Sequence, residues 1–226
     1  MSIVLALLRS PRSGAARVLR EGRLGVALLL VAAATTLSVL NTLRFASEVA
    51  VEEVMFGPGR SPAVDALLAS LGRDMTAVVL HLFQSSWTAL LAVGAVSPVL
   101  VWLLGATAVH AAARLNGLRQ PFRPMLVLFG YAVGLTSPIA LLAALVAGPH
   151  AAGTALPQLA GLLYLGWLGL LAWWGTRTHY GLSGGRALTL LAVALAFFYL
   201  APLTLILLAL AAILIAAVVL EYVPAP

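Results

Sequence analysis

The sequence predicts an all-α, polytopic membrane protein: a bundle of five transmembrane helices with an N-terminal interfacial segment. Of its 226 residues 62% are hydrophobic and only 9% are charged. Soluble domains are about one-quarter charged, so a water-soluble fold could not cover this much apolar surface. The uncharged stretches are 24–43, 75–113, 124–176 and 187–220. Because about 20 apolar residues cross a bilayer, together they hold about five spans.

Residues 1–23 are predicted to form a cytoplasmic, basic interfacial segment. Its arginines face a single acid, Glu21, and are Arg9, Arg12, Arg17, Arg20 and Arg23. Each arginine near anionic headgroups contributes about 1 kcal/mol. The apolar residues Ile3 to Leu8 can dip into the acyl boundary. A cleaved signal peptide is the alternative, but the apolar run from Leu24 is too long for that reading.

Residues 24–226 are predicted to form one five-helix transmembrane domain. Its spans are placed at about 24–45, 86–113, 125–147, 156–174 and 190–220. Residues 46–74 form an outer loop, in which Val64, Leu67, Leu68 and Leu71 recur at the spacing of a short amphipathic helix.

The stretches 75–113 and 187–220 are each assigned one span although each is longer than one bilayer crossing, so each needs an interpretation. Residues 75–113 are read as an interfacial lead-in, 75–85, followed by a span that Ser97-Pro98 kinks. Residues 187–220 contain Pro202 but no polar turn. A bare loop in lipid would leave backbone groups unsatisfied, so one long kinked or tilted helix is expected there.

The charges predict an orientation. With the N-terminus inside and the C-terminus outside, ten arginines lie inside against Glu21, whereas three arginines and six acids lie outside. This is the split that the positive-inside rule demands. All thirteen basic residues are arginine, a bias typical of a GC-rich bacterial genome, so the expected location is the bacterial cytoplasmic (inner) membrane. Because the arginines sit in loops between apolar runs, no nucleic-acid partner is expected.

The third predicted span carries the candidate packing residues. Gly130 and Gly134 stand four apart on one helix face, the spacing that lets two helix backbones approach closely. Tyr131 lies between them, and Ser137-Pro138 follows one turn later. Broken helices in transporters also carry such polar residues, but helix packing is the preferred interpretation of Pro138 and its neighbours.

No catalytic, cofactor-binding or metal-binding residue is predicted. The histidines His81, His110, His150 and His179 are not spaced as metal ligands, and there is no cysteine. His110 is the most interesting, because an ionisable group in a span suggests function, although a contact with headgroups or a neighbouring helix is the preferred reading. Glu48, Glu52 and Glu53 are read as solvated loop acids, and a weak cation site is the alternative.

Several short motifs resemble those of a known family. They are Leu7-Leu8-Arg9-Ser10-Pro11-Arg12, Val18-Leu19-Arg20-Glu21, the stretch Ala108–Gly117 with His110 and Arg114, then Phe122, Tyr131, Ser137-Pro138, and His179-Tyr180-Gly181-Leu182-Ser183. They are similar to the bacterial-type members of the Yip1 family. The resemblance implies five spans and no enzymatic activity. Eukaryotic relatives are associated with vesicle trafficking and Rab-type GTPases, a partner that does not carry over to a bacterium.

The function expected from these features is that of a non-enzymatic membrane scaffold. Its basic segments would bind anionic lipid headgroups or a protein partner, and the candidate contact residues are Arg9, Arg12, Arg17, Arg20, Arg114, Arg119 and Arg123. A membrane-protein partner or a second copy of the chain is also expected. The alternatives are a channel or permease component and an accessory subunit of a larger membrane complex.

Overall fold

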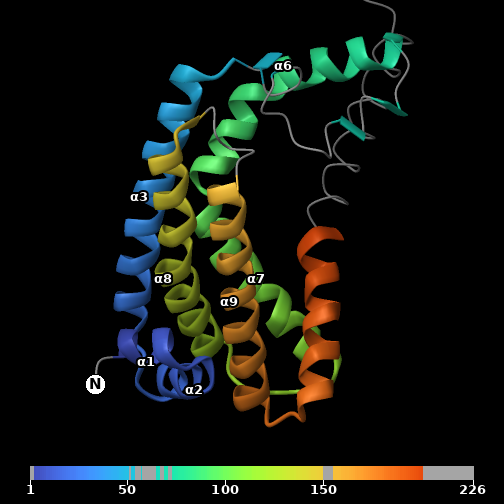
Figure 1. The fold of residues 1–226 in the computed structure, drawn as a ribbon. Helices are drawn as coiled ribbons and strands as arrows, with labels where there is room; N and C mark the ends of the chain where they lie inside the picture. The colour runs from blue at the N-terminus through green and yellow to red at the C-terminus, as the bar shows by residue number, and fades with distance from the viewer. Residues whose placement is uncertain are drawn as a thin grey trace, which may run out of the picture.

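The computed structural model describes residues 3–50, 52–53, 57, 65–66, 69–70, 73–149 and 155–200. Every regular element among these residues is a helix, and the described part contains no strand. Five helices are long and apolar enough to cross a membrane. The predicted class, an all-α polytopic membrane protein, is therefore confirmed (Figure 1).

The chain opens with two short helices, α1 (Ile3–Arg9) and α2 (Pro11–Glu21). Ser10 caps α2, since its hydroxyl accepts a hydrogen bond from the backbone N–H of Ser13 at 3.5 Å, and Pro11 occupies the first helical turn. Both helices lie beneath one end of the bundle in Figure 1. There α2 packs against α8 (Arg123–Ala147) and α9 (Ala155–Tyr180).

The long helices pass back and forth between the two ends of the bundle. Helix α3 (Leu24–Glu48) leads away from α1 and α2, and α6 (Arg73–Ala95) with α7 (Ser97–Leu115) returns. Helix α8 leads away again and α9 returns. A final described helix, Gly184–Leu200, leads away a third time (Figure 1).

Helices α6 and α7 make one crossing together, although each is long enough to count as a span. The ring of Trp87 lies 6.0 Å from that of Phe45, and the backbone carbonyl of Gly94 accepts a hydrogen bond from Ser38. Farther along, Trp102 and Ala27 meet at Gly130. Residue numbers that increase along α6 and α7 therefore pair with residue numbers that decrease along α3. Both helices thus run antiparallel to α3, one after the other.

This crossing differs from the expectation at its break. Helix α6 begins at Arg73, so it includes the expected lead-in 75–85, and it is broken at Val96, so Ser97-Pro98 starts a new helix instead of kinking a continuous one. Proline at the first turn of α7 lacks the N–H that would continue α6. In Figure 1 the first turns of α6 run across the end of the bundle, and only its later turns descend.

Two other boundaries also differ from the sequence-based ones. Helix α9 continues to Tyr180, beyond the expected end at 174, and the next helix begins at Gly184, not at 190. The turn between them is short because Gly181 adopts a positive φ of 65° and Leu182 donates a backbone hydrogen bond to the Arg177 carbonyl. The four residues that predict an amphipathic helix in the outer loop, Val64, Leu67, Leu68 and Leu71, lie outside the described residues, as does the end of the last span.

Helix α8 is the centre of the bundle. It contacts α3, α9, α7 and α2, and 61% of its most apolar window is buried. Its small residues make this possible, because a Cβ on Gly130 would lie 2.7 Å from that of Ala27, and one on Gly134 would lie 2.5 Å from that of Leu30. Backbones approach this closely only where side chains are missing.

Candidate functional site

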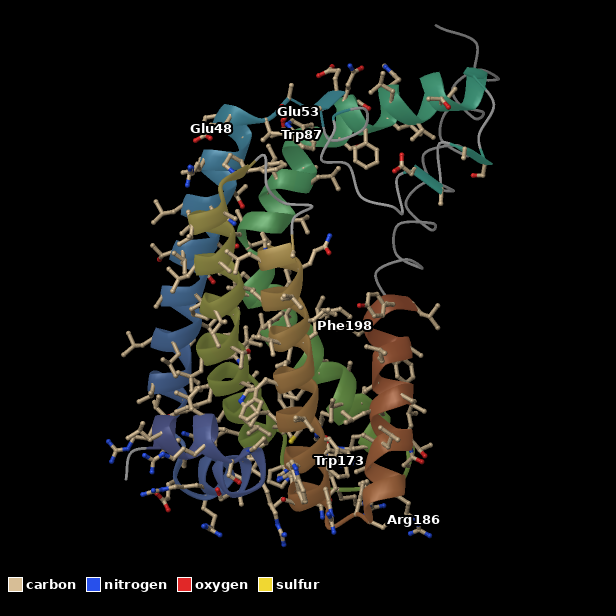
Figure 2. All side chains as sticks on the ribbon, viewed as in Figure 1. Glu48, Glu53, Trp87, Trp173, Arg186 and Phe198 are labelled. Carbon is tan, nitrogen blue, oxygen red and sulfur yellow. The ribbon has the colours of Figure 1, made fainter. Side chains whose placement is uncertain are left out.

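The basic end of the bundle is the strongest candidate for a functional site. It consists of α1, α2, the connection between α7 and α8, and the turn between α9 and the helix Gly184–Leu200. Ten of the thirteen arginines gather there, and the one carboxylate that the described residues place beside them is that of Glu21, which pairs with Arg17 at 2.9 Å. Figure 2 shows side-chain nitrogens along this end, with Arg186 labelled, and Glu48 and Glu53 at the opposite end.

Helices α1 and α2 fold into a tight hairpin that presents arginine beside apolar surface. A Cβ on Gly14 would lie 2.5 Å from the Cα of Leu7, so only glycine allows this crossing. Leu7 is thus buried inside the hairpin and not available to lipid, whereas Leu5 and Leu8 are about half exposed. Arg9, Arg12 and Arg20 are exposed on the same unit. This mixture is typical of an interfacial anchor.

The hairpin is tied to α9 through Trp174. The guanidinium carbon of Arg12 lies 5.3 Å from the Trp174 ring centroid, and that of Arg177 lies 4.9 Å from it. Two cation–π contacts of this kind hold the N-terminal segment on the bundle. Next to it, the indole N–H of Trp173 donates to the carbonyl of Gly184 at 3.0 Å, which fixes the start of the following helix.

A polar cluster joins α7, α9 and the loop between α7 and α8. The Nδ1 atom of His110 lies 3.2 Å from the hydroxyl of Tyr180, and Arg114 Nε donates to His110 Nε2 at 3.4 Å. The ring of Phe122 stacks on His110 with centroids 5.0 Å apart. His179 Nε2 lies 2.9 Å from the carbonyl of Pro121. His110 therefore contacts a neighbouring helix, and this cluster fixes the loop that carries Arg119 and Arg123.

The predicted contact residues share this end but not one patch. Arg9, Arg12, Arg17 and Arg20 lie on the hairpin, whereas Arg114, Arg119 and Arg123 lie around the connection between α7 and α8. Arg17 and Arg114 are partly engaged by Glu21 and His110. Arg12 also contacts the Trp174 ring. All seven residues except Arg17 are exposed.

The polar residues of α8 lie in the packed interior. Thr136 and Ser137 are 1% and 6% exposed, and their hydroxyls donate to the carbonyls of Ala132 and Val133, both at 2.7 Å. These are local bonds one turn back along the helix. Tyr131 is also buried, and Pro138 lies inside α8. None of these four residues lines either of the cavities described below.

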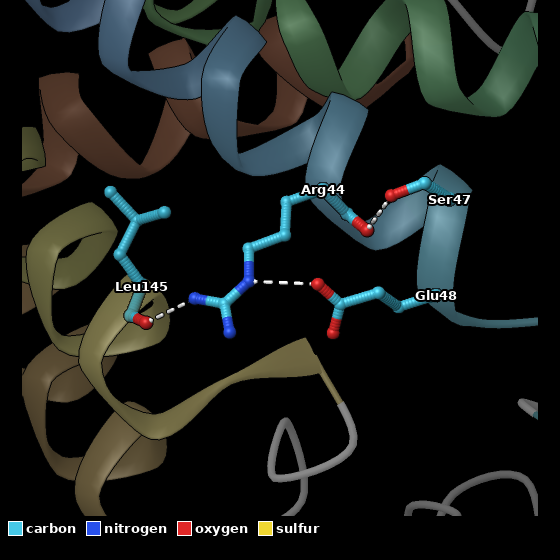
Figure 3. Close-up of polar contacts among 4 residues, drawn as sticks. All are labelled: Arg44, Ser47, Glu48 and Leu145. Atoms are coloured by element: carbon cyan, nitrogen blue, oxygen red, sulfur yellow. Dashed lines mark hydrogen bonds and ion pairs between the residues drawn. The ribbon is translucent and has the colours of Figure 1, made fainter.

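The opposite end is held by a different polar contact, drawn in Figure 3. Arg44 Nη1 donates to the carbonyl of Leu145 at 2.7 Å, and its Nε donates to Glu48 at 3.1 Å. Leu145 is in the last turn of α8, whose final carbonyls have no partner within the helix. One arginine thus caps α8 and ties it to α3.

Two cavities border the helix Gly184–Leu200. The larger, of about 500 Å³, lies between that helix and α7, α8 and α9, and its wall is almost entirely apolar. The smaller, of about 300 Å³, is lined by Asn116, Leu118, Leu182, Arg186, Thr189, Leu190 and Val193 at the basic end. Among the described residues, no three His, Asp or Glu side chains come together as metal ligands.

Sequence reasoning missed three features of the site. It did not pair Trp174 with Arg12. It did not foresee the His110–Tyr180 contact, because the two residues are 70 positions apart. It also gave no sign of the cavities, although the glycines of α9 could have suggested one, since a Cβ on Gly169 would meet nothing within 4 Å.

The fold and the site define a class: a multi-pass membrane protein whose helix bundle ends in a basic, interfacial N-terminal hairpin. Within this class the family is clear, since a family model of the Yip1 domain matches residues 5–206, and the chain belongs to the Yip1 family. The resemblance seen in the short motifs is confirmed. Searches with the whole chain match no curated protein and no solved structure.

Proposed function

We propose that this Yip1-family protein is a non-enzymatic membrane scaffold whose basic end binds the anionic headgroups of one leaflet. The observation that supports this proposal is the gathering of ten arginines at one end, where Glu21 is the only acid among the described residues. Exposed Leu5 and Leu8 add an apolar contact on the same hairpin. Several arginines near a charged surface supply a summed attraction that salt weakens.

The proposal also fixes an orientation. By the positive-inside rule the basic end faces the cytoplasm, in a bacterial inner membrane. The chain has no cysteine, so single cysteines can report it without background. Ser13→Cys on α2 and Ser47→Cys at the end of α3 are exposed positions at opposite ends. In intact cells an impermeant thiol reagent should label only Ser47→Cys. Labelling of Ser13→Cys instead would show that the protein has the opposite orientation.

Headgroup binding is tested by hydrogen exchange in nanodiscs. The amides of α1 and α2 should exchange more slowly in discs that contain phosphatidylglycerol than in pure phosphatidylcholine. The variant Arg9→Gln/Arg20→Gln/Arg119→Gln removes three exposed charges. At about 1 kcal/mol each, the ratio of the exchange rates in the two kinds of disc should shrink up to about 100-fold. Arg44→Gln is the matched control from the opposite end. Equal protection in both discs would refute headgroup binding.

A protein partner along α6 is a second candidate, favoured by one observation. None of the residues Val78–Ala95 is buried, although this window is as long and apolar as a span. Such a helix offers a lateral surface to a membrane subunit or a second copy of the chain. Cross-linking from cysteines placed at Leu82 and Leu90, which are 57% and 45% exposed, should then capture a discrete product, whereas a monomer alone would contradict it.

The channel or permease alternative has less support. Thr136 and Ser137 would be the natural polar lining of a path through α8, yet both hydroxyls are buried and bonded to their own helix. The larger cavity has an apolar wall. Solute flux through liposomes that contain the pure protein would favour transport over the scaffold.

A further inference from the structure

The larger cavity has the dimensions and lining of a hydrocarbon site. Its wall includes Gly105 and Ala108 of α7, Phe129 of α8, Leu165 and Gly169 of α9, and Leu191 of the helix Gly184–Leu200. A volume of about 500 Å³ lies within the usual range of ligand cavities. A methylene group fills nearly the volume of a liquid water molecule, roughly 30 Å³, so the space suits about 16 carbons, which is one long acyl chain.

The cavity lies at the depth of one leaflet. Its lining on the last described helix runs from Leu188 to Tyr199, which at 1.5 Å per residue is about 16 Å. That is about half of a hydrocarbon core of roughly 30 Å. Leu165, Leu188, Leu195 and Tyr199 line the cavity and are also 58–65% exposed, so its rim reaches the outer surface of the bundle. At this depth the surroundings are acyl chains.

A polar pocket lies next to it at the level of the headgroups. The smaller cavity is lined by Arg186, Thr189 and Asn116, and Arg186 stands two residues before Leu188, where the apolar cavity begins. Arg186 is exposed and forms no ion pair with a described residue. A cation directly beneath an apolar cavity complements a lipid with an anionic headgroup.

We propose that the bundle binds one anionic phospholipid of the leaflet at the basic end. One acyl chain enters the cavity between α7, α8, α9 and the helix Gly184–Leu200, and Arg186 binds the phosphate-bearing headgroup. The inference rests on the proposed function, because it narrows a general attraction for anionic headgroups to one lipid in a defined place.

A glycine pair on α9 gives a matched test of the chain site. Gly169 lines the cavity and Gly166 does not, yet a Cβ on either would meet nothing within 4 Å. Gly169→Leu therefore adds bulk at the cavity wall with no clash at its Cβ, whereas Gly166→Leu adds the same bulk outside the cavity. The probe is phosphatidylglycerol with a diazirine at the end of one acyl chain, incorporated into vesicles with the full chain and photoactivated.

The wild type should give adducts concentrated on the cavity-lining residues of α7, α9 and the last described helix. Gly169→Leu should reduce these adducts at least fivefold, and Gly166→Leu should leave them unchanged. Adducts spread evenly over all lipid-facing residues, or unchanged by Gly169→Leu, would overturn the proposal. So would a chemical cross-link that places residues 201–226 in the cavity of the wild type, because the chain itself would then be the occupant.

The headgroup is tested with the same diazirine tail on phosphatidylcholine. The wild type should label more strongly with phosphatidylglycerol, and Arg186→Gln should abolish this preference, while Arg44→Gln, at the opposite end of the bundle, should preserve it. Equal labelling by both lipids in the wild type would remove Arg186 from the proposal. Gly169→Leu should leave the hydrogen-exchange difference of α1 and α2 intact, so failure of the lipid site can be told apart from failure of general headgroup binding.

Discussion

Helices α8 and α6 are both apolar, with mean hydropathies of 1.9 and 1.4 in their most apolar windows, yet they differ in how much of that window is buried. In α8 61% of that window is buried, and in α6 none is. Helix α8 packs through glycines that allow backbone contact, as at Gly134. Helix α6 is attached through a few polar and aromatic contacts. In lipid, hydropathy therefore does not distinguish a core helix from a peripheral one, whereas glycines that a neighbouring backbone approaches closely do.

Single polar bonds matter more on α6 because its packing is sparse. Pro98 has no N–H to give to the carbonyl of Gly94, four residues earlier. The Ser38 hydroxyl of α3 donates to that carbonyl at 2.9 Å instead. A bond that the sequence of α6 cannot make is thus supplied by another helix, as the absence of water in a bilayer requires.

The contrast between the packed α8 and the sparsely packed α6 is tested most directly by replacing one glycine with alanine in each helix. Gly134→Ala should destabilise the bundle by about 1–3 kcal/mol, because the new Cβ overlaps the backbone of Leu30. Gly94→Ala should be neutral or stabilise by less than about 1 kcal/mol, since its Cβ would meet only Thr42 Oγ1, at 3.8 Å. Thermal unfolding in detergent measures both, and equal losses would contradict the contrast.

Removing the bond across the helix break should have the next largest effect. Ser38→Ala should cost about 0.6–1.7 kcal/mol, the range for interhelical hydrogen bonds in membranes. Ser85→Ala, which loses only the hydroxyl's bonds to the His81 and Leu82 carbonyls within α6, is the control and should cost less. In a Pro98→Ala background the restored N–H can satisfy Gly94, so the cost of Ser38→Ala should fall. A double-mutant cycle with no coupling would refute this account.

The cap on α8 should matter less because it is partly exposed. Arg44→Met removes the bonds to Leu145 and Glu48 and should destabilise by less than about 1 kcal/mol. Glu48→Gln removes the ion pair but leaves the bond to Leu145, so its effect should be smaller still. Chemical denaturation in mixed micelles can rank the two variants, and the reverse order would show that the ion pair, not the cap, dominates.

The smallest effect is expected where α6 meets the residues that follow α3. A backbone hydrogen bond of Glu52 and then the amide of Gln84, at 2.7 Å, lower the pKa of the Glu52 carboxyl below its ordinary 4.5. A lowered pKa means that the contact stabilises above pH 4.5 and is lost as pH falls through the folded-state value. Gln84→Ala should move this pKa part of the way back in an NMR titration, and no movement would exclude the contact in solution.

Much of the fold could be predicted from charge and hydropathy alone. The class and the long apolar helices follow from stretches that lipid must surround, whereas the family was indicated only by the resemblance of short motifs such as Leu7–Arg12 and Ala108–Gly117. The break near Ser97-Pro98 was located, but as a kink, because proline permits either a bend or a new start. The helix end at Tyr180 was missed, since Arg177 and His179 resemble loop residues until Trp174 and Pro121 are seen to bind them.

By itself, the sequence determined that lipid is the solvent and that charge divides unevenly along the chain, because both depend only on which residues follow one another. Only the tertiary structure decided which apolar helix forms the core, which arginines remain exposed, and where a cavity opens beside Arg186. Those outcomes depend on contacts between distant residues, such as Gly134 with Leu30 and His110 with Tyr180. The periodicity and composition of the sequence contain no information about contacts between residues so far apart in the chain.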